Sequence, residues 1–287
     1  MWLSPPSARK NGSVSDRIAL VTGANRGYGS YVARHLTGAG FTVAALGRDE
    51  EATTAIADEL SGLALIADLR DRDAVDDAIG SCIAQHGSFD VVVNNAGVGG
   101  TFATAWEAEP DDWWHTVEVN LRGTHNVTRA VVPGMVAAGR GRIVNVVSHA
   151  GTARWPYASA YVVSKAGLIK YGENLAAEVR RTGVVVFNYN PGILDVGLTR
   201  TLFNSTPAAG SLDALVAEWF HEQIDTGNGV DADLSAATLT RLAAGDADVL
   251  SGRYITAYDD LDALIARGAE IASSNAYTLG LITRSEE

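Results

Sequence analysis

Short, almost continuous apolar runs alternate along the chain with longer segments in which apolar residues recur at helical spacing. Six runs lie at 18–23, 41–47, 63–68, 89–97, 142–148 and 184–192, and a shorter seventh lies at 252–256. Because they are rich in Val, Ile, Leu and Ala, they are typical of strands buried on both faces of a sheet. Helical candidates lie between them, for example at 28–37, 50–60 and 74–85. The alternation predicts an α/β fold, a doubly wound (Rossmann), mostly parallel seven-stranded sheet with helices on both faces.

The two ends of the chain depart from this pattern. Residues 1–15 are rich in Pro, Ser and Gly and show no periodicity, so we expect a flexible N-terminal segment there. Residues 258–287 continue past the last predicted strand as a helix and an extended end. This C-terminal extension is expected to pack on the domain or on a neighbouring subunit. A chain of 287 residues suits one α/β domain, which we place at 16–287.

Composition narrows the class of protein. Hydrophobic residues make up 47% of the chain and charged residues 20%, which favours a packed core over a disordered chain. The formal net charge of −12 argues against nucleic acid or an anionic membrane as a partner. The single cysteine, Cys82, cannot form an internal disulfide, and the sequence shows neither a spanning apolar run nor a secretory start. We therefore expect a cytoplasmic protein.

The first predicted strand ends in a glycine-rich turn, TGANRGYG at 22–29. Gly23, Gly27 and Gly29 would let the backbone turn tightly and approach a pyrophosphate at the positive N-terminus of the following helix. A turn without a ligand is the alternative, because short glycine patterns recur by chance. The position between the first strand and the first helix favours a nucleotide site.

Three further strand ends carry residues suited to a nucleotide. Asp68 and Leu69 follow the third strand, where the carboxylate would accept from an adenine amino group or would cap the next helix. NNAG at 94–97 ends the fourth strand with amide and small residues, and Pro191–Gly192 ends the sixth with a rigid turn. Ligands of such sheets bind outside the carboxyl ends of the strands, so these segments are expected to share one site.

Two tyrosines lie near a lysine in YASAYVVSK, residues 157–165. Tyr161 stands four residues before Lys165, on the same helical face, whereas Tyr157 follows a proline and belongs to the preceding loop. The ordinary pKa of a tyrosine is about 10, and it must fall by roughly 3 units for the phenol to exchange protons near neutral pH. A nearby ammonium shifts the pKa in that direction. We predict Tyr161 as an acid/base group and Tyr157 as a pocket wall or a packed side chain.

The order of these motifs resembles the short-chain dehydrogenase/reductase family. The motifs are TGxxxGxG at 22–29, NNAG at 94–97, Asn120 in VEVNLRG, Ser148, YxxxK at 161–165 and PG at 191–192. Each is weak alone, but six in the family's order are specific, and the resemblance spans residues 17–256. It implies binding of NAD(H) or NADP(H), no metal, hydride transfer between a small-molecule carbonyl and an alcohol, and a homodimer or homotetramer.

The resemblance also implies roles for individual residues. Tyr161 would be the catalytic acid/base, and Lys165 would lower its pKa and hold the nicotinamide ribose. Ser148 would hydrogen-bond the substrate oxygen, and Asn120 would position a proton-relay water. The implied cofactor-binding residues are Gly23, Asn25, Arg26, Gly27, Tyr28, Arg48, Asp68, Leu69, Asn95, Ala96, Gly97, Tyr161, Lys165, Pro191, Gly192 and Leu194.

Two positions depart from the family pattern. Tyr28 stands where the family often has Ile, and Val196 stands where a Thr often follows the PG turn. The hydroxyl that would bond the nicotinamide carboxamide is therefore missing, unless Thr199 replaces it.

The end of the second predicted strand decides between the two cofactors. NAD sites usually carry an acid there for the ribose 2′-hydroxyl, whereas a 2′-phosphate needs cations. Here the position of the acid is Gly47, Arg48 follows it, and Arg26 lies in the glycine-rich turn. Asp49 and Glu50 would pair with Arg48 or cap the next helix. We predict NADP(H) as the preferred cofactor, with NAD(H) as the alternative.

These observations predict an NADP(H)-dependent oxidoreductase that interconverts a ketone or aldehyde and an alcohol. Residues 198–230, with the amphipathic segment SLDALVAEWFHEQI, fall where the family places a mobile substrate lid. With His149, Trp155 and Tyr157, the lid predicts an apolar pocket and a hydrophobic substrate. The alternatives are an NAD-dependent alcohol dehydrogenase, a family member with non-redox chemistry and a cofactor sensor without turnover.

Overall fold

The computed structural model describes residues 17–281, and the predicted flexible segment at 1–15 lies outside them. The described chain contains one sheet of seven parallel strands in the order β3-β2-β1-β4-β5-β6-β7. The strands are β1 (Ile18–Thr22), β2 (Thr42–Gly47), β3 (Leu63–Ile66), β4 (Val91–Asn94), β5 (Gly141–Val146), β6 (Val184–Asn190) and β7 (Tyr254–Thr256). The chain winds from β1 out to β3, returns to β4 and winds out to β7. The predicted doubly wound fold is thereby confirmed.

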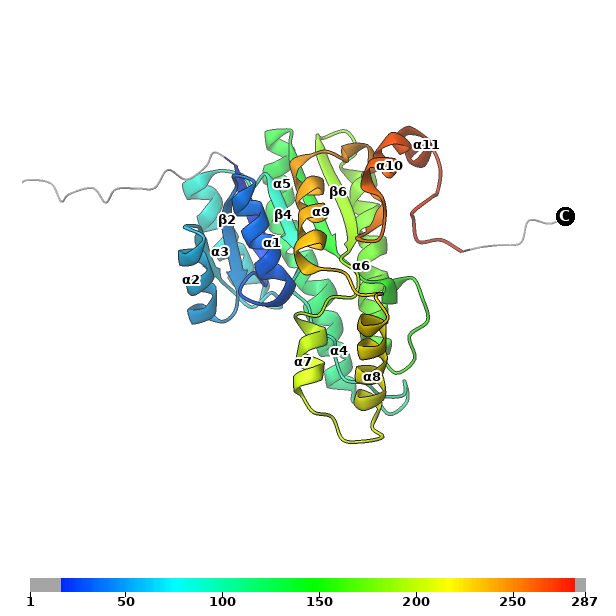
Figure 1. The fold of residues 1–287 in the computed structure, drawn as a ribbon. Coiled ribbons are helices and arrows are strands. Elements are labelled where there is room, and N and C mark those ends of the chain that lie inside the picture. Colours follow the sequence, from blue (N-terminus) through cyan, green and yellow to red (C-terminus); the bar gives the residue numbers. More distant parts are fainter. Residues whose placement is uncertain (1–16, 282–287) are drawn as a thin grey trace, which may run out of the picture.

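Helices cover both faces of the sheet (Figure 1). One face carries α1 (Gly27–Gly38), α2 (Glu50–Glu59) and α9 (Ala232–Ala244). The other face carries α3 (Arg72–His86), α5 (Gly123–Ala138) and α6 (Ser159–Glu178). The remaining α-helices of the described chain are α4 (Pro110–Val117), α7 (Leu198–Asn204), α8 (Leu212–Asp225), α10 (Leu261–Ala266) and α11 (Gly268–Ala272).

Successive strand residues enter two separate cores. In β1, Ala19 and Val21 pack toward α1 and α9, whereas Ile18 and Leu20 pack toward α3 and α5. All four side chains are buried. Because both faces are covered, the strand is apolar from Ile18 to Val21 and does not alternate with polar residues.

Three asparagines interrupt the apolar pattern at registered positions of β4, β5 and β6. The Asn94 side-chain amide donates to Asn145 Oδ1 (2.9 Å), and the Asn145 amide donates to Asn188 Oδ1 (3.3 Å). The Asn188 amide donates to the Ile169 carbonyl on α6 (3.0 Å). The side chain of Asn94 therefore serves the interior of the sheet and does not face the predicted nucleotide.

The predicted lid region contains α7 and α8, which stand side by side beyond the carboxyl ends of the strands (Figure 1). Ala217 is the only buried residue of α8. The helix predicted from the amphipathic segment SLDALVAEWFHEQI is confirmed as α8. Two of its apolar side chains are nevertheless exposed, Leu215 by 55% and Trp219 by 38%. The apolar side of α8 is therefore not fully covered by the domain.

The described part of the C-terminal extension, residues 258–281, packs on its own domain. After α10 and α11, the chain returns along β7, where the Tyr254 amide donates to the Tyr277 carbonyl (2.8 Å). The Leu279 amide then donates to Glu173 on α6 (2.5 Å). Across residues 17–281, the helices lack the length and hydropathy needed to span a bilayer.

Candidate active site

The glycine-rich turn joins β1 to α1 at the carboxyl edge of the sheet. Gly23 and Gly27 have φ values of +64° and +53°, a region that disfavours residues with a side chain. A Cβ on Gly29 would lie 2.2 Å from the Gly23 carbonyl oxygen, so the turn requires glycine there. Arg26, the N-cap of α1, gives no side-chain hydrogen bond to the first amides within the described residues. These donors therefore suit a pyrophosphate.

Thr22 and Asn95 tie this turn to the end of β4. The Thr22 hydroxyl accepts from the backbone amides of Asn95 and Ala96, both at 3.0 Å. The Asn95 side chain donates to the Thr22 carbonyl at 2.9 Å. Asn95 thus shapes the cradle from one strand. Thr22 fixes the same cradle from β1. In the sequence, Thr22 is noted only as the residue before the first glycine of the motif.

The two arginines predicted for a 2′-phosphate are both exposed. Within residues 17–281, the side chains of Arg26 and Arg48 make no hydrogen bond or ion pair. Asp49 accepts from the Ala52 amide (3.1 Å) and caps α2, and within the described residues it forms no ion pair with Arg48. Both guanidinium groups therefore remain available to an anion.

Gly47, the position where an NAD site carries an acid, lies directly against α2. A Cβ there would lie 2.5 Å from Thr53 Oγ1 and 3.8 Å from Asn25 Cγ. Thr53 is buried, and its hydroxyl has no partner among the described residues. An acidic side chain at position 47 would have to displace the Thr53 hydroxyl, and Gly47 itself offers no carboxylate of the kind that NAD favours there.

Asp68 pairs with Arg70 and does not cap a helix. The Arg70 guanidinium lies 2.7 Å from Asp68 Oδ2, and the Arg70 amide donates to Oδ1 at 2.9 Å. These bonds from Arg70, with a smaller contribution from Arg48, hold the pKa of Asp68 below its usual range. Asp71 caps α3 instead. The role of Asp68 at an adenine stays a prediction.

Three predicted cofactor residues, Tyr28, Leu69 and Leu194, turn their side chains into the cores. Leu69 and Leu194 are both buried, one in each core. Only their backbone groups are suited to contact a cofactor, and the Leu69 carbonyl already accepts from Asn126 Nδ2 (2.8 Å).

Asn120 lies in a π-helical turn, Glu118–Arg122, between α4 and α5. Its buried side chain accepts from the Val98 amide (2.8 Å) and donates to the Val98 carbonyl and the Ser164 hydroxyl, both at 2.9 Å. Ser164 donates onward to the Tyr161 carbonyl at 2.7 Å. Asn120 thus joins the segment after NNAG to α6, and Ser164 is a residue that the sequence analysis did not predict. The role of Asn120 with a relay water stays a prediction.

Tyr161 and Lys165 occupy one face of α6. Lys165 Nζ lies 5.7 Å from the centre of the Tyr161 ring and donates to the Val146 carbonyl at 2.9 Å. Gly97 admits both Lys165 and Asn120, since a Cβ there would lie 3.7 Å from the lysine nitrogen and 3.0 Å from Asn120 Oδ1. The structure therefore brings together four of the predicted residues, Gly97, Asn120, Tyr161 and Lys165.

The pKa shifts differ from the sequence prediction. Burial raises the pKa of Tyr161, and a hydrogen bond with Ser148 opposes the rise. Burial lowers the pKa of Lys165 to about 8. The predicted lowering of the Tyr161 pKa by Lys165 is therefore not found, because burial dominates the shift and Ser148, not Lys165, opposes it.

Aromatic side chains connect the loop before α6 to the lid region. Trp155 meets Trp219 and Phe220 of α8 edge to face, with ring centres 5.2 and 5.5 Å apart. Tyr157 is not packed in the core, since it is 43% exposed with a φ of +69°. Its carbonyl accepts from the Ala103 amide at 2.9 Å. The aromatic cluster therefore links α8 to the segment between Ser148 and Tyr161.

The PG turn lies at the carboxyl end of β6. Gly192 has a φ of +83°, and a Cβ there would lie 2.5 Å from Val230 Cγ2. Val196 packs against the core and offers no hydroxyl. Thr199 lies in α7, and its hydroxyl makes no hydrogen bond within the described residues.

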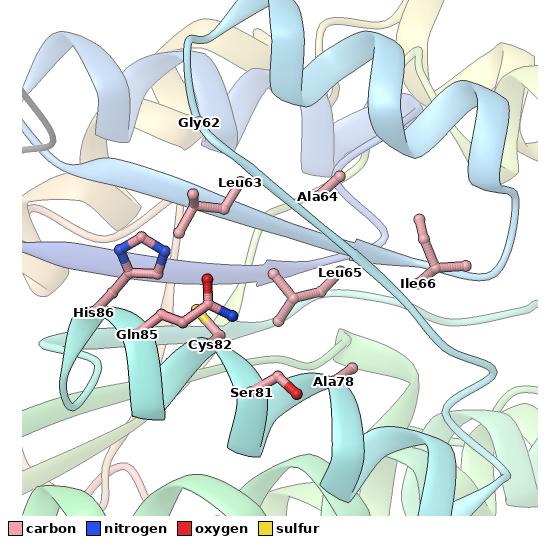
Figure 2. A pocket seen from close by; sticks show the side chains of 10 residues that line it. All are labelled: Gly62, Leu63, Ala64, Leu65, Ile66, Ala78, Ser81, Cys82, Gln85 and His86. Atoms are coloured by element: carbon pink, nitrogen blue, oxygen red, sulfur yellow. The ribbon is translucent and has the colours of Figure 1, made fainter. Parts of the chain in front are cut away.

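A separate groove runs between edge strand β3 and α3 (Figure 2). Its lining includes Leu65, Ile66, Cys82 and His86. Burial raises the pKa of the Cys82 thiol to about 11, which makes the thiol a weak nucleophile. Among residues 17–281 we find no cluster of His, Cys, Asp and Glu arranged to hold a metal.

Comparison with known proteins adds family relationships to this geometry. A family model described as short chain dehydrogenase matches residues 17–206. The NADP-dependent 3-hydroxy acid dehydrogenase YdfG of Salmonella typhi is 39% identical over 181 residues, covering 62% of this chain and 72% of the relative. A short chain dehydrogenase of Pseudocercospora fijiensis is 29% identical over 286 residues, covering 95% and 92%.

Solved structures with the same fold include oxidoreductases. A variant of actinorhodin polyketide ketoreductase with NADPH matches with a TM-score of 0.76 and 27% identity, covering 84% of this chain and 95% of that chain. A gluconate 5-dehydrogenase from Burkholderia cenocepacia in complex with NADP and tartrate matches with a TM-score of 0.74 and 29% identity, covering 84% and 92%.

Proposed function

Because the chain belongs to the short-chain dehydrogenase family and is an NAD(P)-dependent oxidoreductase, we propose that it uses NADP(H) to interconvert a ketone or aldehyde and a hydrophobic alcohol. The grouping of Ser148, Tyr161 and Lys165 beside Gly97 and Asn120 is the observation that carries this proposal.

Proton transfer in this proposal runs through Tyr161. Ser148 lowers the pKa of Tyr161 against the effect of burial, so the two hydroxyls face one site and one substrate oxygen could contact both. In the reductive direction Tyr161 donates its proton to that oxygen, and its raised pKa keeps the phenol protonated at neutral pH. Lys165, held by the Val146 carbonyl, stabilises the resulting phenolate. When bound, NADPH would supply the hydride for the carbonyl carbon.

The preference for NADP(H) is supported by two arginines that make no hydrogen bond or ion pair within residues 17–281, and by Gly47, which has no carboxylate for a ribose 2′-hydroxyl. Arg26 and Arg48 are exposed on the side of the sheet where an adenosine ribose would lie. The relatives named NADP-dependent agree with this preference.

A hydrophobic substrate is supported by the aromatic wall. Trp155, Trp219 and Phe220 contact one another between the loop before α6 and α8. We propose that residues 198–230 form the lid of an apolar pocket and that these rings line it. An apolar ligand would bury part of the aromatic surface of these rings, which favours its binding.

A 3-hydroxy acid is the second candidate substrate, after the activity named for the bacterial relatives. Arg154 lies in the same loop as Trp155, is exposed and makes no ion pair within residues 17–281. Its guanidinium would suit a substrate carboxylate.

Matched substrates separate the two candidates. An apolar ketone, a 3-oxo acid and the neutral ester of that acid would each be supplied with NADPH, and the loss of cofactor absorbance measured. Faster turnover of the ketone and the ester supports the apolar pocket. Faster turnover of the acid, lost in Arg154→Ala, supports the second candidate. No turnover of any carbonyl would contradict reductase activity.

We propose further that the protein is a homodimer or homotetramer. Trp114 of α4 is 59% exposed, and with Leu121, His125 and Tyr171 it lines a groove between α4, α5 and α6. The same face of a second chain would bury these side chains.

A further inference from the structure

Two hydroxyl groups and one carbonyl, those of Tyr28, Ser235 and Pro191, form a buried hydrogen-bond chain next to the proposed cofactor site. Tyr28 Oη, in the first turn of α1, lies 2.9 Å from Ser235 Oγ on α9. Ser235 Oγ lies 2.9 Å from the Pro191 carbonyl oxygen, at the end of β6. Tyr28 is 7% exposed and Ser235 is fully buried. A residue of α9 therefore connects the turn after β1 with the turn after β6.

The donors in this chain are fixed by chemistry. The Pro191 carbonyl can only accept, so the single hydroxyl hydrogen of Ser235 is directed to it. Ser235 Oγ must then accept from Tyr28, which donates its own hydrogen. Burial raises the pKa of Tyr28 and keeps the phenol a donor. Tyr189 Oη also lies 3.2 Å from Ser235 Oγ and donates to the Ser235 carbonyl at 3.0 Å, but only Tyr28 belongs to the phosphate-binding turn.

We propose that Tyr28 and Ser235 are positioning residues that hold the phosphate-binding turn and the nicotinamide-side turn at a fixed separation. The inference rests on the proposed function, because it assumes one cofactor across both turns. β1 carries the phosphate turn, and β6 lies on the far side of β4 and β5, beside the strand that leads to Ser148. A cofactor extended across these strands would contact both turns.

The chain also fills a role left open by Val196. That position has no hydroxyl for the nicotinamide end, and Val196 is partly buried against the core. The PG turn is instead fixed from below through its Pro191 carbonyl. An apolar side chain at position 28 would fill the same space but would not reach Pro191 through Ser235.

The test compares a ligand that spans both turns with one that contacts only the adenosine end. Dissociation constants for NADPH and for adenosine 2′,5′-bisphosphate would be measured by quenching of tryptophan fluorescence. Tyr28→Phe and Ser235→Ala should each weaken NADPH roughly tenfold, the scale of one lost buried hydrogen bond. Both should bind the bisphosphate within about twofold of the wild type.

Thr240→Ala is the matched control. Its hydroxyl is on α9 too but bonds only Ala236 of its own helix (2.8 Å), so neither ligand should change. The double variant Tyr28→Phe/Ser235→Ala should be no weaker than the weaker single variant, because the groups act in series.

Equal losses for both ligands, or no loss for either, would overturn the inference while leaving the proposed function intact. Additive losses in the double variant would overturn it as well. Failure of the wild type to bind NADPH would overturn the proposed function and the inference together. If Ser235→Ala does not fold, Tyr28→Phe alone decides between these outcomes.

Discussion

Gly27 and Gly197 meet backbone to backbone: a Cβ on Gly27 would lie 2.7 Å from the Gly197 Cα. The first belongs to the phosphate-binding turn, and the second is the N-cap of α7. Both have positive φ values, +53° and +61°. The start of the proposed lid therefore rests directly on the proposed cofactor cradle.

Gly27→Ala should separate these two segments. We expect NADPH affinity to fall about tenfold or more, because the new methyl group clashes with backbone and the residue has a positive φ. Fluorescence titration measures the affinity. Gly38→Ala, in the same helix, is the control, since its Cβ would meet nothing within 4 Å. Unchanged NADPH affinity in Gly27→Ala would show that the contact is not needed for binding.

Tyr161→Phe should lower the turnover rate by at least about two orders of magnitude, because the proton donor is lost. Tyr157→Phe should stay within a few-fold of the wild type, since the Ala103 amide bonds the Tyr157 backbone and not its hydroxyl. Steady-state kinetics on one substrate compares them. If Tyr157→Phe is the inactive variant, the two roles have been exchanged.

Lys165 gives the stability of the protein a pH dependence. Its folded pKa, about 8, lies below its ordinary value of 10.5. Between these values the unfolded chain binds a proton that the folded chain does not, so this contribution to the unfolding free energy rises with pH. Relative to Lys165→Met, the wild type should gain about 2 to 3 kcal/mol from pH 8 to 10. Urea denaturation at several pH values measures it, and a constant difference would contradict the lowered pKa.

Arg48→Ala should weaken NADP(H) about ten- to a hundredfold and leave NAD(H) unchanged, because one charged hydrogen bond to the 2′-phosphate is lost. Titration of both cofactors into both proteins measures this. Arg72→Ala is a control, since Arg72 is an exposed arginine paired with Asp73. Equal or tighter binding of NAD(H) by the wild type would reverse the cofactor assignment.

Light scattering should give a mass of two or four chains of 30.1 kDa. Trp114→Glu should shift the mass toward one chain, because a charge would be buried in the proposed interface. A single-chain mass for the wild type at micromolar concentration would contradict the oligomer.

The sequence is most informative where one short segment determines the structure. The turn at 22–29 and the Tyr161–Lys165 spacing depend on neighbouring residues and helical geometry alone. Contacts between distant segments leave no such pattern, so neither the Asn120–Ser164 bond nor Thr53 beneath Gly47 was predicted. The direction of the Tyr161 pKa shift depends on burial, which requires the folded environment. The short helix α7 was also missed, since its seven residues carry too little periodicity.

The side-chain amides of the three asparagines in β4, β5 and β6 take an orientation that is fixed by the Ile169 carbonyl on α6. The Ile169 carbonyl cannot donate, so Asn188 must turn its nitrogen toward α6 and its oxygen toward Asn145. Asn145 must then turn its nitrogen toward Asn188 and its oxygen toward Asn94. Rotating any one amide by half a turn would set two oxygens or two nitrogens against each other. The middle of the sheet therefore holds a row of amides that all donate in the same direction, from β4 toward α6.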